Sequence, residues 1–238
     1  MTPLDNPAWH ALSGPQAAFA LGAGAARRFH PDVGVFAAMP DALTDGAWDD
    51  LATLLDGAPA CIFRTDRPEA PAGWRVVEVL PGHQMVAGGP IGTTEDGFVP
   101  LGAPDAPEML ALTGRTRPGP FFARTVELGG YLGLRDDRGE LVAMAGERLR
   151  FPGHTEISAV CTDEPVRRRG LAGRLVRAVA ARIEARGETP MLHLSATNTA
   201  ARALYEALGF TVRADVDFVI LFPPERPGPV PGSPRERL

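Results

Sequence analysis

The chain has 238 residues and a mass of 25.2 kDa, with 45% hydrophobic and 22% charged residues. This ordinary globular composition excludes collagen-like, disordered and membrane-spanning chains and fits one or two domains. All 24 basic residues are Arg, and 29 acidic residues give a net charge of −5. Nucleic acid is therefore not expected as a partner, because such binding needs clustered positive charge. The second half, 121–238, nevertheless holds 17 of the Arg residues, so an anionic ligand should bind there.

Cysteine usage and the amino-terminal segment bear on the compartment. Cys61 and Cys161 are far apart in sequence, and neither has a second Cys or a His at metal-ligand spacing. The sequence therefore indicates no disulfide framework and no metal site, as in a reduced intracellular protein. The first ten residues lack a basic region followed by an apolar run, and no apolar stretch approaches the ~20 residues of a membrane helix. We expect a cytoplasmic protein without a membrane partner.

The first part of the chain, 1–92, is rich in Pro, Gly and Ala and predicts a small α+β module. Apolar residues recur at helical spacing over 45–56, which predicts a helix. Short apolar runs over 60–64 and 74–80, each bounded by Pro or Gly, predict strands. The segment 86–94 contains three Gly and one Pro and favours no regular element. We therefore place a linker there and a domain boundary after residue 92.

The second part, 93–223, predicts a larger α+β domain. Asn198 is a good N-cap, and Gly187 and Gly209 stand where two helices should end. The Pro-rich residues 224–238 are expected to form a flexible tail. In chain order we expect a short helix over 106–113, a hairpin over 131–151 and a strand over 155–162. A helix over 170–185, a strand over 191–195 and a helix over 198–208 should follow, with two closing strands over 210–212 and 218–222.

The segment 156–173 carries the clearest chemical signal, a strand that enters a basic, glycine-bearing turn and then a helix. A helix N-terminus presents unpaired backbone N–H groups and a favourable dipole to an anion, and small residues let a pyrophosphate approach closely. Arginine side chains add charge-assisted hydrogen bonds. By itself such a turn fits a solvated surface equally well. Its residues are Arg167, Arg168, Arg169, Gly170, Leu171, Ala172 and Gly173.

Two motifs carry a family resemblance. Arg167-Arg-Arg-Gly-Leu-Ala172 matches the Arg/Gln-x-x-Gly-x-Gly/Ala signature of the GNAT acyl-CoA-dependent N-acetyltransferases. The segment 192–210, with Asn198 and Tyr205, resembles the second signature of that family. Both occur in the family's order and spacing, and the resemblance covers roughly 98–222. The glycine N-acyltransferase-like branch looks closest, judging by the segment Glu156-Ile-Ser-Ala-Val-Cys-Thr162 and by the N-terminal module, which resembles a degenerate copy of the same fold.

The resemblance implies an α+β fold with a mixed, centrally splayed sheet flanked by helices, and acetyl-CoA as cosubstrate. The turn 167–173 would hold the pyrophosphate, and Asn198 would lie beside the pantetheine arm. Tyr205 would protonate the departing thiolate, a step that suits a phenol with an ordinary pKa of about 10. A core aromatic is the alternative for Tyr205. The strand whose backbone would pair with the pantetheine arm carries Ala159, Val160 and Cys161.

The acceptor amine must be neutral to attack a thioester, and for an amine with a pKa of ~10.4 deprotonation at pH 7 costs about 4.6 kcal/mol. Glu156 and His193 occupy positions where some members of the resembled family carry a catalytic base. We rank the two equally as candidates, with Glu147 behind them. His193 has an ordinary pKa of ~6.5, near working pH. A hydrogen-bonded structural histidine fits the pattern as well.

These inferences predict an N-acetyltransferase that transfers an acetyl group directly from acetyl-CoA to a primary amine of a small molecule, amino acid or peptide. The N-terminal module is expected to cover the acceptor side, and the enzyme to be a monomer or homodimer. One alternative is a non-catalytic acyl-CoA-binding or regulatory protein that kept the turn and lost the chemistry. A longer-chain or amino-acid acyltransferase would share the same fold and differ in pocket size.

Overall fold

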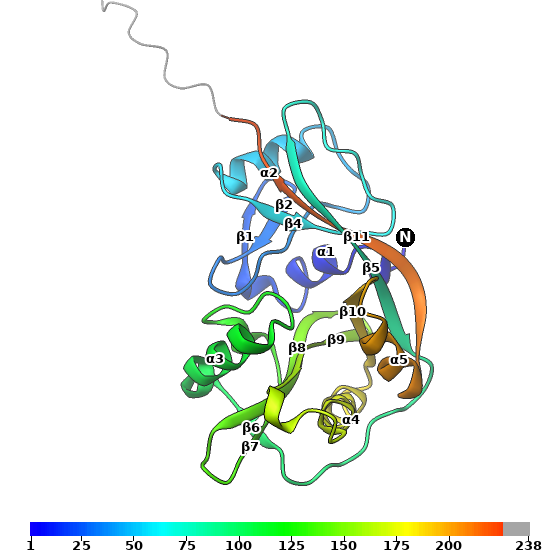
Figure 1. Cartoon of the computed structure of the whole chain (residues 1–238). Coiled ribbons are helices and arrows are strands. Elements are labelled where there is room, and N and C mark those ends of the chain that lie inside the picture. Colours follow the sequence, from blue (N-terminus) through cyan, green and yellow to red (C-terminus); the bar gives the residue numbers. More distant parts are fainter. Residues whose placement is uncertain (226–238) are drawn as a thin grey trace, which may run out of the picture.

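A computed structural model describes residues 1–225. It contains a small antiparallel sheet in the order β1-β2-β3 and a mixed sheet of eight strands in the order β4-β11-β5-β10-β9-β8-β7-β6 (Figure 1). The helices are α1 Pro7–Leu12, α2 Ala47–Leu55, α3 Ala106–Thr116, α4 Leu171–Glu184 and α5 Thr199–Ala207. The strands are β1 Ala20–Ala23, β2 Ala26–Phe29, β3 Ala37–Ala38, β4 Ala60–Ile62, β5 Arg75–Ala87, β6 Val99–Leu101, β7 Tyr131–Arg135, β8 Leu141–Phe151, β9 His154–Thr162, β10 Thr189–Ser195 and β11 Phe210–Phe222.

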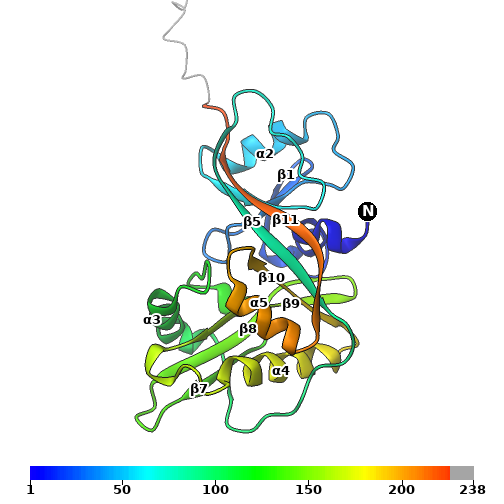
Figure 2. The ribbon, with the colours of Figure 1, turned by 45° about the vertical axis from the view of Figure 1, so that its right-hand side comes forward.

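Helices pack on both faces of the large sheet because each has one apolar side. The apolar positions of α4 that repeat at helical spacing, among them Leu175, Val179 and Ile183, are fully buried. Together with α5 they form the core on one face (Figure 2). On the other face α3 packs against β7, β8 and β9, and α1 packs against the end of β8. The predicted α+β class, with a mixed sheet flanked by helices and a small N-terminal sheet, is confirmed.

The large sheet opens between β9 and β10, its single parallel pair of strands. Only three residue pairs join these strands, and the last is Met191 with Glu156. Beyond that point β10 continues to pair with β5 on its other edge. On β9, Ala159 and Val160 face the single residue Ala145 of β8 in a β-bulge, and Ala159 has a φ of +51°. The bulge turns β9 away from β10, which produces the predicted splay.

The two strands β5 and β11 are longer than their sequence patterns indicate, and they form a twisted ribbon that joins the two ends of the molecule (Figures 1 and 2). The prediction of separate strands over 210–212 and 218–222 is wrong, because one strand spans Phe210–Phe222 with a bulge after Val212. Polar residues between the two apolar runs hide this continuity in the sequence. Pairing with β5 along almost the whole length of β11 satisfies the backbone groups of these polar residues.

The strand predicted over 74–80 likewise extends to Ala87, so the first two residues of the predicted linker lie inside β5. The large sheet therefore includes strands from both sides of residue 92, while the division into two folding units at that residue stays a prediction. Within residues 1–225 no helix is long and apolar enough to cross a membrane. Most of the predicted flexible tail, 224–238, lies outside the described residues.

Candidate active site

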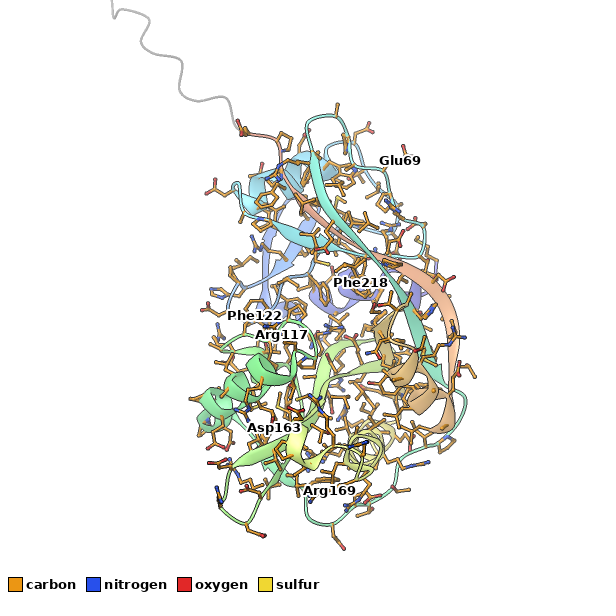
Figure 3. The ribbon with its side chains drawn as sticks, viewed as in Figure 1. Glu69, Arg117, Phe122, Asp163, Arg169 and Phe218 are labelled. Atoms are coloured by element: carbon orange, nitrogen blue, oxygen red, sulfur yellow. The ribbon has the colours of Figure 1, made fainter. Side chains whose placement is uncertain are left out.

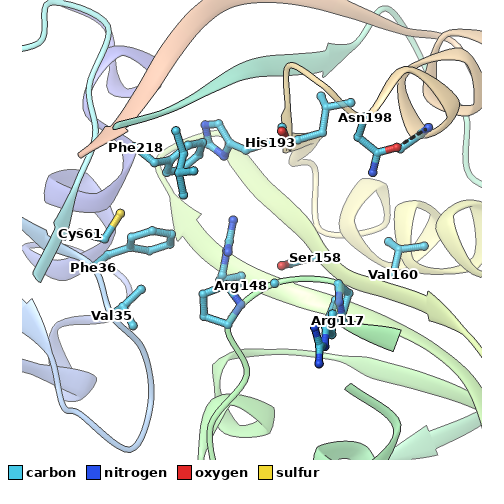
Figure 4. Close-up of a pocket in the computed structure, with 18 of the residues that line it drawn as sticks. Val35, Phe36, Cys61, Arg117, Arg148, Ser158, Val160, His193, Asn198 and Phe218 are labelled. Atoms are coloured by element: carbon cyan, nitrogen blue, oxygen red, sulfur yellow. Dashed lines mark hydrogen bonds between the residues drawn. The ribbon is translucent and has the colours of Figure 1, made fainter. Parts of the chain in front are cut away.

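A pocket of about 550 Å³ occupies the opening between β9 and β10 and extends toward the N-terminal residues. One end is lined by residues of β9 and α5, and the other by β4, β11 and the segment before β3. Figure 4 shows Val160 and Asn198 at the first end, Phe36, Cys61 and Phe218 at the second, and Arg148, Ser158 and His193 between them. The pocket thus brings β9 and the second motif region together with residues from the first part of the chain, whereas none of residues 167–173 lines it.

The basic turn has the local geometry that the sequence predicts for an anion site. Gly170 has a φ of +74° and precedes the first residue of α4, and Arg168 also has a left-handed φ of +62°. No backbone N–H of residues 168–173 donates to a partner within 1–225. The three Arg side chains are exposed and form no ion pair with a described carboxylate. Figure 3 shows Arg169 at the lower part of the molecule, well away from Phe218.

Tyr205 and Asn198 of the second motif reach the same pocket. The Asn198 side chain accepts a hydrogen bond from the N–H of Ala201 at 3.1 Å, which confirms its predicted N-cap position. Tyr205 borders the pocket, and its hydroxyl has no hydrogen-bond partner among residues 1–225. Burial raises the pKa of this phenol to about 12. The hydroxyl therefore stays protonated at neutral pH and has its hydrogen available for a ligand.

Glu156 lies beneath the centre of the pocket and is fully buried. Arg148 donates two hydrogen bonds to its carboxylate, at 2.8 and 2.6 Å, and Nδ1 of His193 lies 2.7 Å from Oε1. Burial alone would raise the pKa of Glu156, but the charge and hydrogen bonds of Arg148, with a further contribution from His193, lower it to about 2. Glu156 is therefore an ionised and weakly basic group, well suited to hold its two neighbours in place.

Both ring nitrogens of His193 are engaged. Because an ionised carboxylate can only accept, Nδ1 carries the hydrogen that it donates to Glu156. Nε2 lies 3.2 Å from the side-chain amide nitrogen of Gln84, and Arg213 fixes that amide by donating to its oxygen at 2.9 Å. With the Gln84 side chain held in this orientation, its amide nitrogen is the donor toward Nε2. The third candidate, Glu147, forms two hydrogen bonds with Arg186 and does not line the pocket.

The comparisons with known proteins can be set beside this geometry. A solved GNAT-family protein from Novosphingobium aromaticivorans is 42% identical to this chain, covers 94% of it and matches over 100% of its own length, with a TM-score of 0.86. The chain belongs to the GNAT acetyltransferase superfamily. A family model described as FR47-like protein also matches residues 131–219 of this GNAT protein.

More distant structures share the fold of this GNAT protein. A GCN5-related N-acetyltransferase from Kribbella flavida is 20% identical, covers 92% of the chain and 96% of its own, and has a TM-score of 0.58. A Drosophila protein is 21% identical, and the match covers 84% of this chain and 74% of the Drosophila chain with a TM-score of 0.58. No curated protein sequence matches the chain significantly.

Sequence reasoning missed four residues that shape the pocket of this GNAT protein. The Arg148 guanidinium lies 4.8 Å from the centroid of the Phe36 ring, and the Phe218 ring stacks on Phe36 with a centroid separation of 6.2 Å. Arg117 stands on the rim with a φ of +50°. They come from four separate elements, so no local motif could group them. The only local signal was the Pro/Gly break that follows Arg117. Within residues 1–225 no group of His, Cys, Asp or Glu could hold a metal ion.

Proposed function

We propose that this GNAT protein is an enzyme that transfers the acetyl group of acetyl-CoA to a primary amine in a ternary complex. The observation that carries the proposal is one continuous pocket that is lined by Tyr205 and runs along the opening between β9 and β10. Holding both reactants in one site supplies proximity, and no covalent enzyme intermediate is needed. The pocket end formed by Val160, Asn198 and Tyr205 receives the thioester, and the opposite end receives the amine.

The cosubstrate is bound mainly by backbone groups. The N–H groups of residues 168–173 and the start of α4 bind the pyrophosphate, and Arg167, Arg168 and Arg169 supply positive charge. The pantetheine arm lies along the backbone of Ala159, Val160 and Cys161, which no strand pairs on the side of β10. The Cys161 side chain is buried against α3, and burial raises its thiol pKa to about 11. Its contribution is therefore structural and not nucleophilic.

In the transfer step the amine nitrogen attacks the thioester carbon, the new C–N bond forms and the C–S bond breaks. Tyr205 gives its hydroxyl hydrogen to the leaving thiolate and is reprotonated from solvent. Nε2 of His193 takes the proton of the attacking amine, exchanging its contact with Gln84 for one with the amine or a bridging water. Glu156 keeps the Nδ1 hydrogen in place and stabilises the resulting imidazolium, as a carboxylate does in other acid–base pairs.

Two measurements test the proposal. Calorimetry should show saturable acetyl-CoA binding, and a thiol-release assay across amines, amino acids and peptides should show turnover. Binding without turnover would favour the non-catalytic alternative, and no binding at millimolar ligand would refute both. The base is tested by His193→Asn, because Asn keeps a donor for Glu156 and lacks the basic nitrogen. We expect kcat/KM to fall about 100-fold or more. Because the buried ring also packs against Phe63 and Phe218, the variant should lose some stability, and it is assayed where circular dichroism shows it to be folded.

Three finer statements stay predictions. The glycine N-acyltransferase-like branch rests on the sequence of β9 and on the N-terminal module. The cytoplasmic location rests on cysteine usage and on the lack of an apolar stretch of membrane-helix length in the sequence. The monomeric or homodimeric state is an expectation only. Sedimentation of the purified protein measures the last of these directly.

A further inference from the structure

The pocket end opposite Tyr205 is apolar. Its walls are contributed by the segment before β3 and by β4, β5 and β11. Phe36, Phe63 and Phe218 form one aromatic cluster with centroid separations of 4.8 to 6.2 Å. The thiol of Cys61 is protonated at neutral pH, because burial raises its pKa to about 12. The apolar side chains of this end are Val35, Phe36, Cys61, Leu80, Phe218 and Ile220.

Among the described residues 1–225, none that lines the pocket is acidic. Glu156 is fully buried behind Arg148 and His193 and already accepts hydrogen bonds from both. Two guanidinium groups do line the pocket. Arg148 is neutralised by Glu156, whereas the exposed Arg117 has no ion-pair or hydrogen-bond partner for its side chain among residues 1–225. A ligand with a second ammonium group would therefore meet positive charge and find no counter-ion.

On the basis of the proposed function, we propose that the acceptor is a primary amine with an apolar body and no second cationic group. The apolar body lies against Phe36, Cys61 and Phe218, so that the amine faces the thioester near Tyr205. Polyamines and peptides rich in Lys or Arg are poor acceptors. Apolar contact favours amines with an apolar body, and the absence of a counter-ion disfavours amines with a second cationic group.

A matched pair of amines separates these two effects. Phenethylamine has one ammonium group, and 4-(aminomethyl)phenethylamine adds a second ammonium group to the same ring. We expect kcat/KM with acetyl-CoA to be at least 10-fold higher for phenethylamine, and spermidine to be weaker still. Calorimetry with the full chain and CoA gives a readout without chemistry, in which phenethylamine should bind more tightly than the diamine by a similar factor.

Two variants locate the effect in the pocket. Arg117→Glu places a carboxylate on the rim and should narrow the preference between the two amines to less than 3-fold. Arg138→Glu makes the same change at an exposed turn between β7 and β8, outside the pocket, and should leave the preference unchanged. Phe36→Leu keeps an apolar core residue and should weaken phenethylamine binding more than acetyl-CoA binding.

Equal or reversed rates for the two amines would overturn the inference while leaving the proposed function standing. A preference for hexanoyl-CoA over acetyl-CoA, with no preference between the amines, would assign the apolar end to the acyl chain and overturn it also. If phenethylamine binds in the presence of CoA with the expected preference and no amine is acetylated, the proposed function fails and the inference about the pocket holds. Absence of both amine binding and turnover refutes the two together.

Discussion

Replacing Glu156 with Gln removes the negative charge that neutralises Arg148 and leaves a guanidinium group largely buried beneath the pocket. In the native protein the Arg148 side chain is only 16% exposed, and Glu156 is fully buried. Removing one partner of such a pair destabilises proteins by about 3 to 5 kcal/mol, because the remaining charge is uncompensated. Gln keeps an acceptor for Nδ1 of His193, so the expected loss comes mainly from the charge.

The lowered pKa of Glu156 leads to a similar loss of stability. The pKa of Glu156 falls from an ordinary value of 4.5 to about 2 in the folded protein, which corresponds to about 3 kcal/mol of stabilisation at neutral pH. Because the folded-state pKa is depressed, this stabilisation is fully present above pH 4.5 and is lost as the pH falls toward 2. The stability difference between the native protein and E156Q should therefore be largest at pH 7 and shrink across that acidic range.

Urea unfolding followed by circular dichroism from pH 7 down to pH 3 measures this difference. Glu206→Gln is the matched control, because it breaks an exposed ion pair with Arg202 one helical turn away, which contributes at most about 1 kcal/mol. The double variant R148M/E156Q should be more stable than E156Q, since it leaves no unpaired charge. Equal stability of E156Q and the native protein at pH 7, or a difference that does not change with pH, would refute the reasoning.

Three further predictions concern the cosubstrate site. Gly170→Ala and Gly187→Ala place a Cβ at nearly the same φ, +74° and +75°, with open space around both, so each variant should lose about 1 kcal/mol of stability. Only Gly170→Ala should weaken acetyl-CoA binding, by 10-fold or more in calorimetry. Equal effects of the two variants on binding would argue against pyrophosphate binding at the turn. Tyr205→Phe should leave the Kd for acetyl-CoA within 2-fold and lower kcat at least 10-fold, and unchanged turnover would remove Tyr205 from the mechanism. Arg168→Gly removes a side chain at a left-handed φ of +62° and should raise the free energy of unfolding by about 1 kcal/mol. The same variant should weaken acetyl-CoA binding, and tighter binding would contradict a role of the Arg168 side chain in binding the pyrophosphate.

Local sequence signals pointed to the family and to the proposed cosubstrate side of the site. The basic turn with Gly170, the N-cap Asn198 and the position of Tyr205 lie in two contiguous segments. Their geometry depends on backbone conformation, capping and helix periodicity, which are properties of neighbouring residues. The class of fold followed from the same patterns. For this reason the structure reproduces the turn, α4 and α5 close to where the sequence places them.

Tertiary structure alone shows which residues form the proposed acceptor side and how the two candidate bases are paired. Arg148, Phe36 and Phe218 lie on three segments that are distant in sequence and meet only in the folded protein, where β11 brings Phe218 to Phe36. The sequence ranked Glu156 and His193 as equals, since both are titratable residues on adjoining strands. Only the packing shows that Arg148 holds one as a permanent anion while that anion orients the other. Such pairings depend on strand register and burial, which no local pattern encodes.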